Sequence, residues 1–231
     1  MTLPKTEGYE DSQETREVIC DVGRRMYARN LVAATDGNIS VRLRNGNVLG
    51  TPSAMPKGLM TPEDLVVCDV KGEKVAGNGR VTSEIFTHLA VYEERPDAHA
   101  VVHAHPPNAV ACTLAGIALA EPLLPEIIAT LGGVPTADYA APGTPEGSEV
   151  IRELIRDCDA VMLDRHGAVT LGSTLMDAYH RLEKVEHAAE TIIAARSLGE
   201  PIRLPNKEIE KLYRLGADYG ATGKHYRPRK P

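Results

Sequence analysis

The sequence is poor in aromatic residues, in positive charge and in long apolar runs, and each shortage argues against a class of function. Aromatic residues make up 4% of the 231 residues, with no tryptophan and one phenylalanine, which disfavours base-stacking platforms and carbohydrate-lectin surfaces. The formal net charge is -6, so the chain lacks the basic footprint of a nucleic-acid-binding protein. No apolar run approaches the roughly 20 residues that span a bilayer, so no membrane association is predicted.

Cysteine is also scarce, and linker-like segments are missing. The four cysteines are far apart and form no CxxC pair: Cys20, Cys68, Cys112 and Cys158. We expect buried thiols in a reducing cytoplasm, with no signal peptide ahead of them. Because no Ser/Gly-rich or Pro-rich linker divides the chain, residues 1–231 are predicted to form one domain. Its C-terminal tail, from about residue 220, is expected to be mobile.

Hydrophobic periodicity predicts helices interleaved with strands. Helices are predicted at residues 12–28, 83–93, 107–114, 144–156, 174–198 and 206–219. Strands are predicted at residues 39–43, 48–51, 65–70, 98–104, 134–139, 159–163 and 168–171. Asn45-Gly46, between the first two strands, is a hairpin signal. An early hairpin followed by interleaved helices predicts an α/β fold, a three-layer α/β/α sandwich with a mixed, largely antiparallel central sheet.

Two histidines end one of these strands. His103-Ala104-His105 follows an apolar run, and side chains two residues apart on a strand point to the same face. The two imidazoles therefore converge, which pre-arranges half of a tetrahedral metal site. His166 is the best candidate for a third ligand, because it follows another strand that is predicted to be buried. From the pair alone a structural role has equal weight, but Pro106 places the pair where a strand meets a loop, and functional sites concentrate there.

Turns that carry hydroxyl groups form a second feature. Thr82-Ser83-Glu84 opens a predicted helix, where free backbone N–H groups and the helix dipole favour an anion such as phosphate. Ordinary capping by Ser83, with Glu84 in the first helical turn, explains the same residues. Residues 35–38 and 51–53 are further turns at strand ends, and each alone is an ordinary turn.

These segments, taken together and in order, resemble the class II aldolase/adducin family and its L-fuculose-phosphate aldolase branch in particular. The matching motifs are Thr35-x-Gly37-Asn38-Ile39-Ser40, Thr51-Pro52-Ser53, Thr82-Ser83-Glu84 with His88, His103-x-His105-Pro106 and His166-Gly167. The resemblance implies a zinc site, with manganese or cobalt as alternatives, held by His103, His105 and His166. It implies that Glu84 ligates the metal when substrate is absent and serves as the general acid/base. It assigns the sugar phosphate to Gly37, Asn38, Ser53, Thr82 and Ser83, and a proton-transfer role to Tyr219, which closes over the site.

The resemblance further implies a metal-dependent lyase that forms a homotetramer with sites at subunit boundaries. Such an enzyme cleaves a ketose 1-phosphate, of the fuculose, ribulose or deoxypentulose phosphate type, to dihydroxyacetone phosphate and an aldehyde. A zinc-stabilised enediolate would form on the way. Sugar-phosphate 4-epimerases, dehydratases and decarboxylases use the same kind of metal site and stay as alternatives. A non-catalytic, adducin-like assembly module is a further alternative, although it would need neither the three histidines nor Glu84.

Some residues depart from the family pattern or are secondary to it. Glu126 stands where aldolases of this branch often have tyrosine. It is expected either to contact substrate hydroxyls or act as a second acid/base, or to lie at the surface or an interface. Ala54 replaces a common glycine, so its methyl group is expected to crowd one amide of the phosphate site. Lys57 is expected to be a solvated loop lysine, and His88, four residues after Glu84, is expected to support that residue rather than bind metal.

Overall fold

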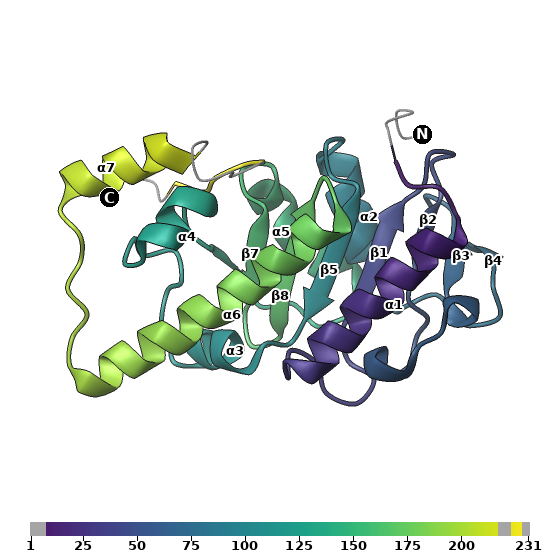
Figure 1. Ribbon diagram of the computed structural model, residues 1–231, viewed down its shortest axis with the longest axis horizontal. Helices are drawn as coiled ribbons and strands as arrows, with labels where there is room; N and C mark the ends of the chain where they lie inside the picture. Colours follow the sequence, from purple (N-terminus) through teal and green to yellow (C-terminus); the bar gives the residue numbers. More distant parts are fainter. Residues whose placement is uncertain (1–7, 217–222, 228–231) are drawn as a thin grey trace.

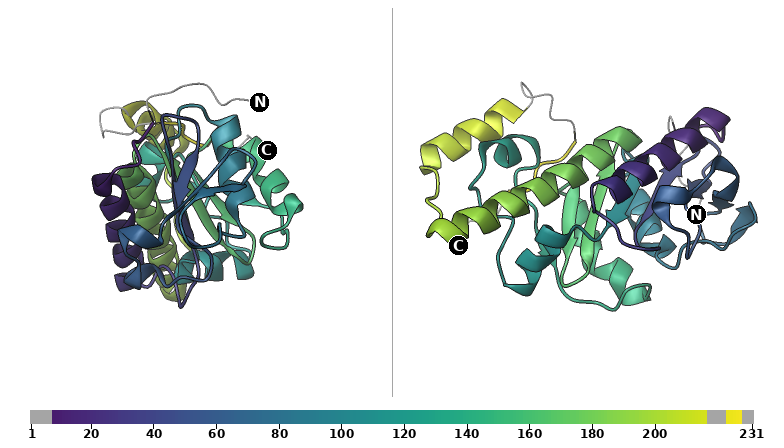
Figure 2. Two further views of the ribbon diagram at one scale, coloured as in Figure 1. Left: turned by 90° about the vertical axis from the view of Figure 1, so that its right-hand side faces the viewer. Right: turned by 60° about the horizontal axis from the view of Figure 1, so that its bottom comes forward.

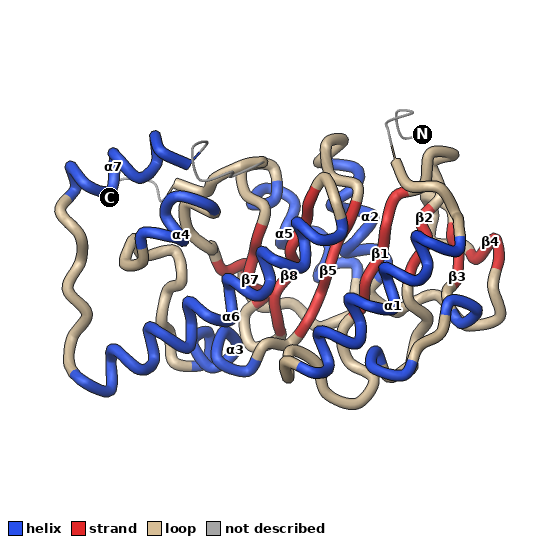
Figure 3. The backbone as a smooth tube through the Cα atoms, in the orientation of Figure 1, coloured by secondary structure: helices blue, strands red, loops and turns tan. Residues whose placement is uncertain are grey.

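The computed structural model describes residues 8–216 and 223–227. The helices are α1 (Gln13–Ala28), α2 (Ile85–Glu94), α3 (Pro107–Leu114), α4 (Pro125–Thr130), α5 (Pro145–Ile155), α6 (Leu175–Leu198) and α7 (Asn206–Leu215). The strands are β1 (Asn38–Arg42), β2 (Val48–Gly50), β3 (Val66–Cys68), β4 (Lys74–Ala76), β5 (Ala100–Ala104), β6 (Thr136–Ala137), β7 (Ala160–Leu163) and β8 (Gly167–Gly172). Figure 3 shows that these strands stand side by side across the middle of the molecule.

The strands form one mixed sheet in the order β4-β3-β2-β1-β5-β8-β7-β6. Every neighbouring pair is antiparallel except β6 and β7, which are parallel. Helices α1 and α6 cover one face of the sheet, whereas α2 and α5 cover the other (Figures 1 and 2). The predicted α/β sandwich with a mixed, largely antiparallel sheet is therefore confirmed.

The two faces of the sheet have separate apolar cores, as strand alternation requires. On β5, Val102 packs into the cluster beneath α1 and α6, and its neighbour Val101 packs into the cluster beneath α2 and α5. On β1, Ile39 and Val41 belong to the first cluster. The alternate residues of β1 are polar and buried, and they face α2.

The start of α2 differs from the prediction. The helix begins at Ile85, so Glu84 occupies the N-cap position and makes no side-chain capping bond. The backbone N–H of Glu84 donates to Thr82 Oγ1 at 3.4 Å instead, and Ser83 is exposed. The predicted capping by Ser83 is wrong, because the helix begins one residue later than that prediction requires. The carboxylate of Glu84 lies beside His103 and His166 instead.

The other differences concern short elements. Helix α4 and strand β4 were not predicted, and the strand expected at 134–139 shrinks to Thr136–Ala137. The last predicted helix, 206–219, is described as far as Leu215, and its final residues lie outside the described part of the chain. Of the helices in residues 8–216, none combines the length and hydropathy needed to cross a membrane.

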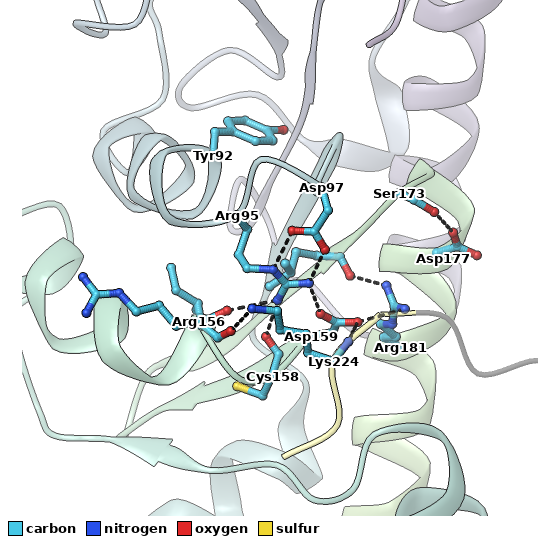
Figure 4. A network of polar contacts seen from close by, with 12 residues as sticks. Tyr92, Arg95, Asp97, Arg156, Cys158, Asp159, Ser173, Asp177, Arg181 and Lys224 are labelled. Atoms are coloured by element: carbon cyan, nitrogen blue, oxygen red, sulfur yellow. Dashed lines mark hydrogen bonds and ion pairs between the residues drawn. The ribbon is translucent and has the colours of Figure 1, made fainter. Parts of the chain in front are cut away.

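A buried ionic network fastens the C-terminal residues 223–227 to the sheet (Figure 4). Asp159, at 2% exposure, lies between Arg95 Nη2 at 2.7 Å and Arg181 Nη2 at 3.0 Å. The backbone N–H of Lys224 donates to Asp159 Oδ2 at 3.0 Å. Arg95 also forms a bidentate pair with Asp97, at 2.8 and 2.7 Å. The described end of the chain is thus held by charge-assisted hydrogen bonds on a desolvated carboxylate.

Candidate active site

Three histidines from two neighbouring strands meet at one end of the sheet. His103 is on β5, His105 follows it, and His166 precedes β8, which pairs with β5. Their ring centroids are 4.8–4.9 Å apart. One ligand atom from each ring lies within 4.8 Å of the others. The spacing seen in the sequence thus brings three imidazoles to one point, as a metal site requires.

The nitrogen positions fit a divalent cation. His103 Nδ1 donates to Ala168 O at 3.0 Å, which leaves Nε2 as the nitrogen that faces the other two rings. His103 Nε2 and His105 Nε2 are 3.1 Å apart, close to the edge of about 3.3 Å of a tetrahedron with Zn–N bonds of about 2.0 Å. His105 Nδ1 lies 3.5 Å from Asp36 Oδ2. A backbone carbonyl and a carboxylate therefore orient two of the rings, as is usual around metal-binding histidines.

Glu84 completes this cluster from the N-terminal end of α2. Its Oε2 lies 3.0 Å from His103 Nε2 and its Oε1 lies 3.2 Å from His166 Nε2. Burial opposes ionisation of Glu84, but the charge of His103 and the hydrogen bonds from His103, His166 and Asn38 outweigh it and hold the pKa of Glu84 far below its usual range. The carboxylate accepts hydrogen bonds from His103 and His166 only while their Nε2 atoms carry hydrogens. When these nitrogens carry none, the carboxylate is free to exchange a proton with a substrate.

The predicted phosphate-binding residues lie in three turns that the structure ties together. Asn38 Nδ2 donates to Glu84 Oε2 at 2.8 Å, and the backbone N–H of Ser53 donates to Arg80 O at 2.9 Å. Pro52 and Val81 form an isolated bridge, so Ser53 and Thr82 belong to adjacent segments. Gly37 has a φ of +72°, and a Cβ there would lie 2.8 Å from His103 O. Only glycine lets this turn approach the histidine strand so closely.

Lys57 corrects the sequence-based interpretation, because it is buried at 1% exposure rather than solvated. Its Nζ donates to Thr35 O at 2.9 Å and to Met55 O at 2.6 Å, and so it joins two of the turns. Neighbouring Ala54 has a φ of +58°, a left-handed conformation that glycine adopts without strain. The buried ammonium group of Lys57 thus places a positive charge between these turns, whose hydroxyl groups carry none. Nothing in the local sequence distinguishes Lys57 from an exposed lysine.

Lys57 should make the stability of the protein depend on pH. Burial lowers the pKa of Lys57 from 10.5 to about 8, against the opposing charges of Asp36 and Glu84. Between these two values the unfolded chain binds more protons at this residue than the folded chain, so the free energy of unfolding rises with pH. We expect wild type to gain up to about 3 kcal/mol over Lys57→Met between pH 7.5 and 10.5.

Urea unfolding of both proteins at a series of pH values measures this difference. Lys71→Met, which removes an exposed lysine from a turn, serves as the control and should show no such trend. A difference between wild type and Lys57→Met that stays constant across this range would show that the folded protein does not hold Lys57 in a desolvating environment.

A cavity opens beside the cluster, with an empty volume of about 330 Å³. Glu84, His103 and His166 form part of its wall. The remaining wall comes from the end of β7, from α2 and α5 and from the loop before α5, and consists of Thr87, Asp138, Ala140, Ala141, Pro142, Gly143, Gly147, Val150 and Leu163. Sequence reasoning missed the loop 138–143, because residues such as Ala140 and Ala141 carry no chemical signal.

Two predicted catalytic residues do not join the cluster within the described chain. Glu126 is exposed on α4, which packs beside α7 and lies far from the end of β5 that carries the histidines (Figure 1). Burial lowers the pKa of Lys184 on α6, and the negative charge of Glu126 opposes that shift, so the carboxylate lies near α6. Tyr219 lies outside the described residues.

Comparison with known proteins identifies the family of the chain. The profile of the Class II Aldolase and Adducin N-terminal domain matches residues 17–193. A 5-deoxy-D-ribulose 1-phosphate aldolase of Bacillus thuringiensis is 33% identical over 90% of this chain and 98% of its own. A 3-oxo-tetronate 4-phosphate decarboxylase of Haemophilus influenzae is 31% identical over 87% of this chain and 97% of its own.

A solved structure shows the same fold. An L-fuculose 1-phosphate aldolase superposes with a TM-score of 0.81 and 29% identity, over 88% of this chain and 96% of that one. The profile match covers most of the chain, and both relatives are covered almost completely. The protein belongs to the class II aldolase and adducin family.

Proposed function

We propose that the protein is a divalent-metal-dependent lyase that cleaves a ketose 1-phosphate to dihydroxyacetone phosphate and an aldehyde. The observation that carries the proposal is the position of the Glu84 carboxylate, 3.0 and 3.2 Å from two of three converging histidines, in the wall of a cavity. The three histidines are the proposed ligands of zinc, or of manganese or cobalt. A non-catalytic, adducin-like assembly module would not require these histidines or Glu84.

The residues of the chain divide the work between anchoring and proton transfer. The turns that contain Gly37, Asn38, Ser53, Thr82 and Ser83 are proposed to hold the phosphate, with Lys57 as a buried positive charge between two of them. This anchor positions the reacting carbons beside the cluster. A bound cation would stabilise negative charge on substrate oxygens as a Lewis acid. Glu84 is proposed to move the proton at the carbon that loses its partner when the carbon–carbon bond breaks.

The experiment is an assay of products from metal-loaded protein. Fuculose, ribulose and deoxypentulose 1-phosphates are offered in turn, and dihydroxyacetone phosphate is followed with a coupled dehydrogenase. The proposal expects release of dihydroxyacetone phosphate from at least one of them and loss of this activity after chelation. Consumption of substrate without release of dihydroxyacetone phosphate would favour an epimerase or dehydratase over an aldolase.

Decarboxylation is the second candidate, because relatives named 3-oxo-tetronate 4-phosphate decarboxylase reach 31–33% identity. Loss of carbon dioxide from a 3-oxo acid also leaves negative charge next to a carbonyl group, so the same cluster serves it. A phosphorylated 3-oxo acid therefore belongs in the same panel. Carbon dioxide from this compound, with no dihydroxyacetone phosphate from any sugar, would favour the decarboxylase.

We further propose a cytoplasmic homotetramer whose sites lie at subunit boundaries. Exposed apolar side chains on the described surface, such as Leu59 at 76%, Leu198 at 91% and Ile202 at 93%, are suited to contacts between subunits. All four cysteines are buried and unpaired, as expected in a reducing compartment. In such a tetramer Glu126 of one subunit would be available to another subunit's site. Sedimentation equilibrium tests the tetramer, and a monomeric protein would contradict it.

A further inference from the structure

A row of buried polar side chains runs from Glu84 into the protein between β1 and α2. Asn38, Ser40, His88 and Tyr92 are at most 3% exposed. Asn38 Nδ2 lies 2.8 Å from Glu84 Oε2, and Asn38 Oδ1 lies 2.5 Å from His88 Nε2. Ser40 Oγ lies 2.6 Å from His88 Nδ1 and 2.9 Å from the Tyr92 hydroxyl. Four hydrogen bonds thus connect Glu84 with the hydroxyl group of Tyr92, further along α2.

The chemistry of these groups fixes every hydrogen in the row. Asn38 Nδ2 donates to Glu84 Oε2, so the amide turns its oxygen toward His88. That oxygen accepts only, so the hydrogen lies on His88 Nε2. A ring that carries its hydrogen on Nε2 presents an unprotonated Nδ1, which accepts from Ser40 Oγ at 2.6 Å. Ser40 then accepts from Tyr92, whose pKa burial raises.

We propose that His88 is a positioning residue for Glu84, which it orients through the Asn38 amide by a directed chain of hydrogen bonds. The inference rests on the proposed role of Glu84 and deepens it. The other tautomer of His88 would demand an N–H of Asn38 and would turn the amide oxygen against the Glu84 carboxylate. The row of hydrogen bonds excludes that arrangement, so Glu84 is held in one orientation between His103 and His166. His88 therefore acts through Asn38 on β1, although Glu84 is the N-cap of the helix that carries His88.

Two substitutions separate this role from simple packing. His88→Phe keeps an aromatic ring of similar shape but removes the N–H that Asn38 accepts. His88→Gln loses the ring but places an amide N–H near the position of Nε2. We expect kcat of the Phe variant to fall about 10–100-fold, with KM within about threefold, as for other residues that orient active-site groups. The Gln variant should recover most of the loss. A packing role predicts the opposite order of the two variants.

Nitrogen NMR gives a readout that does not depend on turnover. In protein labelled with ¹⁵N-histidine, the resonances missing from His88→Gln identify His88, and their shifts report the tautomer. The chain predicts the neutral Nε2–H form at pH 7, and it predicts that the side-chain amide of Asn38 exchanges its hydrogens faster in His88→Phe than in wild type.

Each result decides the proposal. An Nδ1–H tautomer or a charged ring in wild type would overturn it, as would a Phe variant that equals or exceeds the Gln variant in kcat, or a loss confined to KM. If wild type cleaves none of the substrates, the proposed function fails. The tautomer of His88 and the hydrogen exchange of the Asn38 amide then still decide whether this row of hydrogen bonds exists.

Discussion

Glu84→Gln is expected to lower kcat by about 10²–10⁴-fold while the protein keeps its fold and its metal. Glutamine has nearly the same shape and still presents an oxygen to the histidines, but it cannot take up or release a proton at working pH. The residue sits at the N-cap of α2 without a capping bond, so the helix loses no side-chain cap. The measurement is kcat on the best substrate, with metal content determined on the same samples.

Glu93→Gln is the matched control, because it makes the same substitution on the same helix. Glu93 is half exposed and pairs with Arg152 at 2.9 Å, an interaction of the kind that contributes little. Its kcat should equal that of wild type. A Glu84→Gln enzyme that keeps its metal and retains more than about a tenth of wild-type kcat would show that another residue moves the proton.

Asp159→Asn is expected to destabilise the protein by about 3–5 kcal/mol. The substitution preserves the volume of the side chain but removes the one negative charge that lies between Arg95 and Arg181. Arg95 is itself 2% exposed and would keep Asp97 as its only carboxylate among the residues that the structure describes (Figure 4). A buried guanidinium with too few partners is costly, because water cannot replace the lost charge.

Urea unfolding at a fixed protein concentration measures this loss. Glu149→Gln removes an exposed carboxylate that pairs with Arg152 at 2.9 Å, and it should change the free energy of unfolding by less than about 1 kcal/mol. Limited proteolysis near residues 223–227 should also become faster in Asp159→Asn, since Lys224 loses its charged acceptor. Equal stability of the two variants would mean that the network does not hold the C-terminal residues.

The parts of the site that could be predicted are those whose geometry is local. Two histidines separated by one residue on a strand must face the same side, and His166 could be paired with them because both segments end a strand. The sheet and its principal helices followed from periodicity in the same way. The separation between Glu84 and His88 also placed them close together, although Glu84 is only the N-cap of α2 and the connection between the two runs through Asn38.

The parts that could not be predicted depend on neighbours far apart in the chain. The Nζ of buried Lys57 donates to Thr35 O, 22 residues away in the sequence. The polar residues of β1 find their hydrogen-bond partners only when α2 packs against them. Ser40 and Tyr92, for example, are 52 residues apart in the sequence. Glu126 illustrates the same limit. Its motif placed it near the substrate, yet α4 holds it away from the histidines within its own subunit.

The central claim is that His103, His105 and His166 hold one divalent cation beside Glu84, and metal analysis tests it most directly. Wild type and His105→Ala are dialysed against the same zinc-containing buffer, and zinc per chain is determined by mass spectrometry after removal of free metal. His105 is partly exposed, so its loss leaves the core intact. We predict one zinc per wild-type chain and far less in the variant. Equal zinc content in both proteins, or none in wild type, would contradict the account.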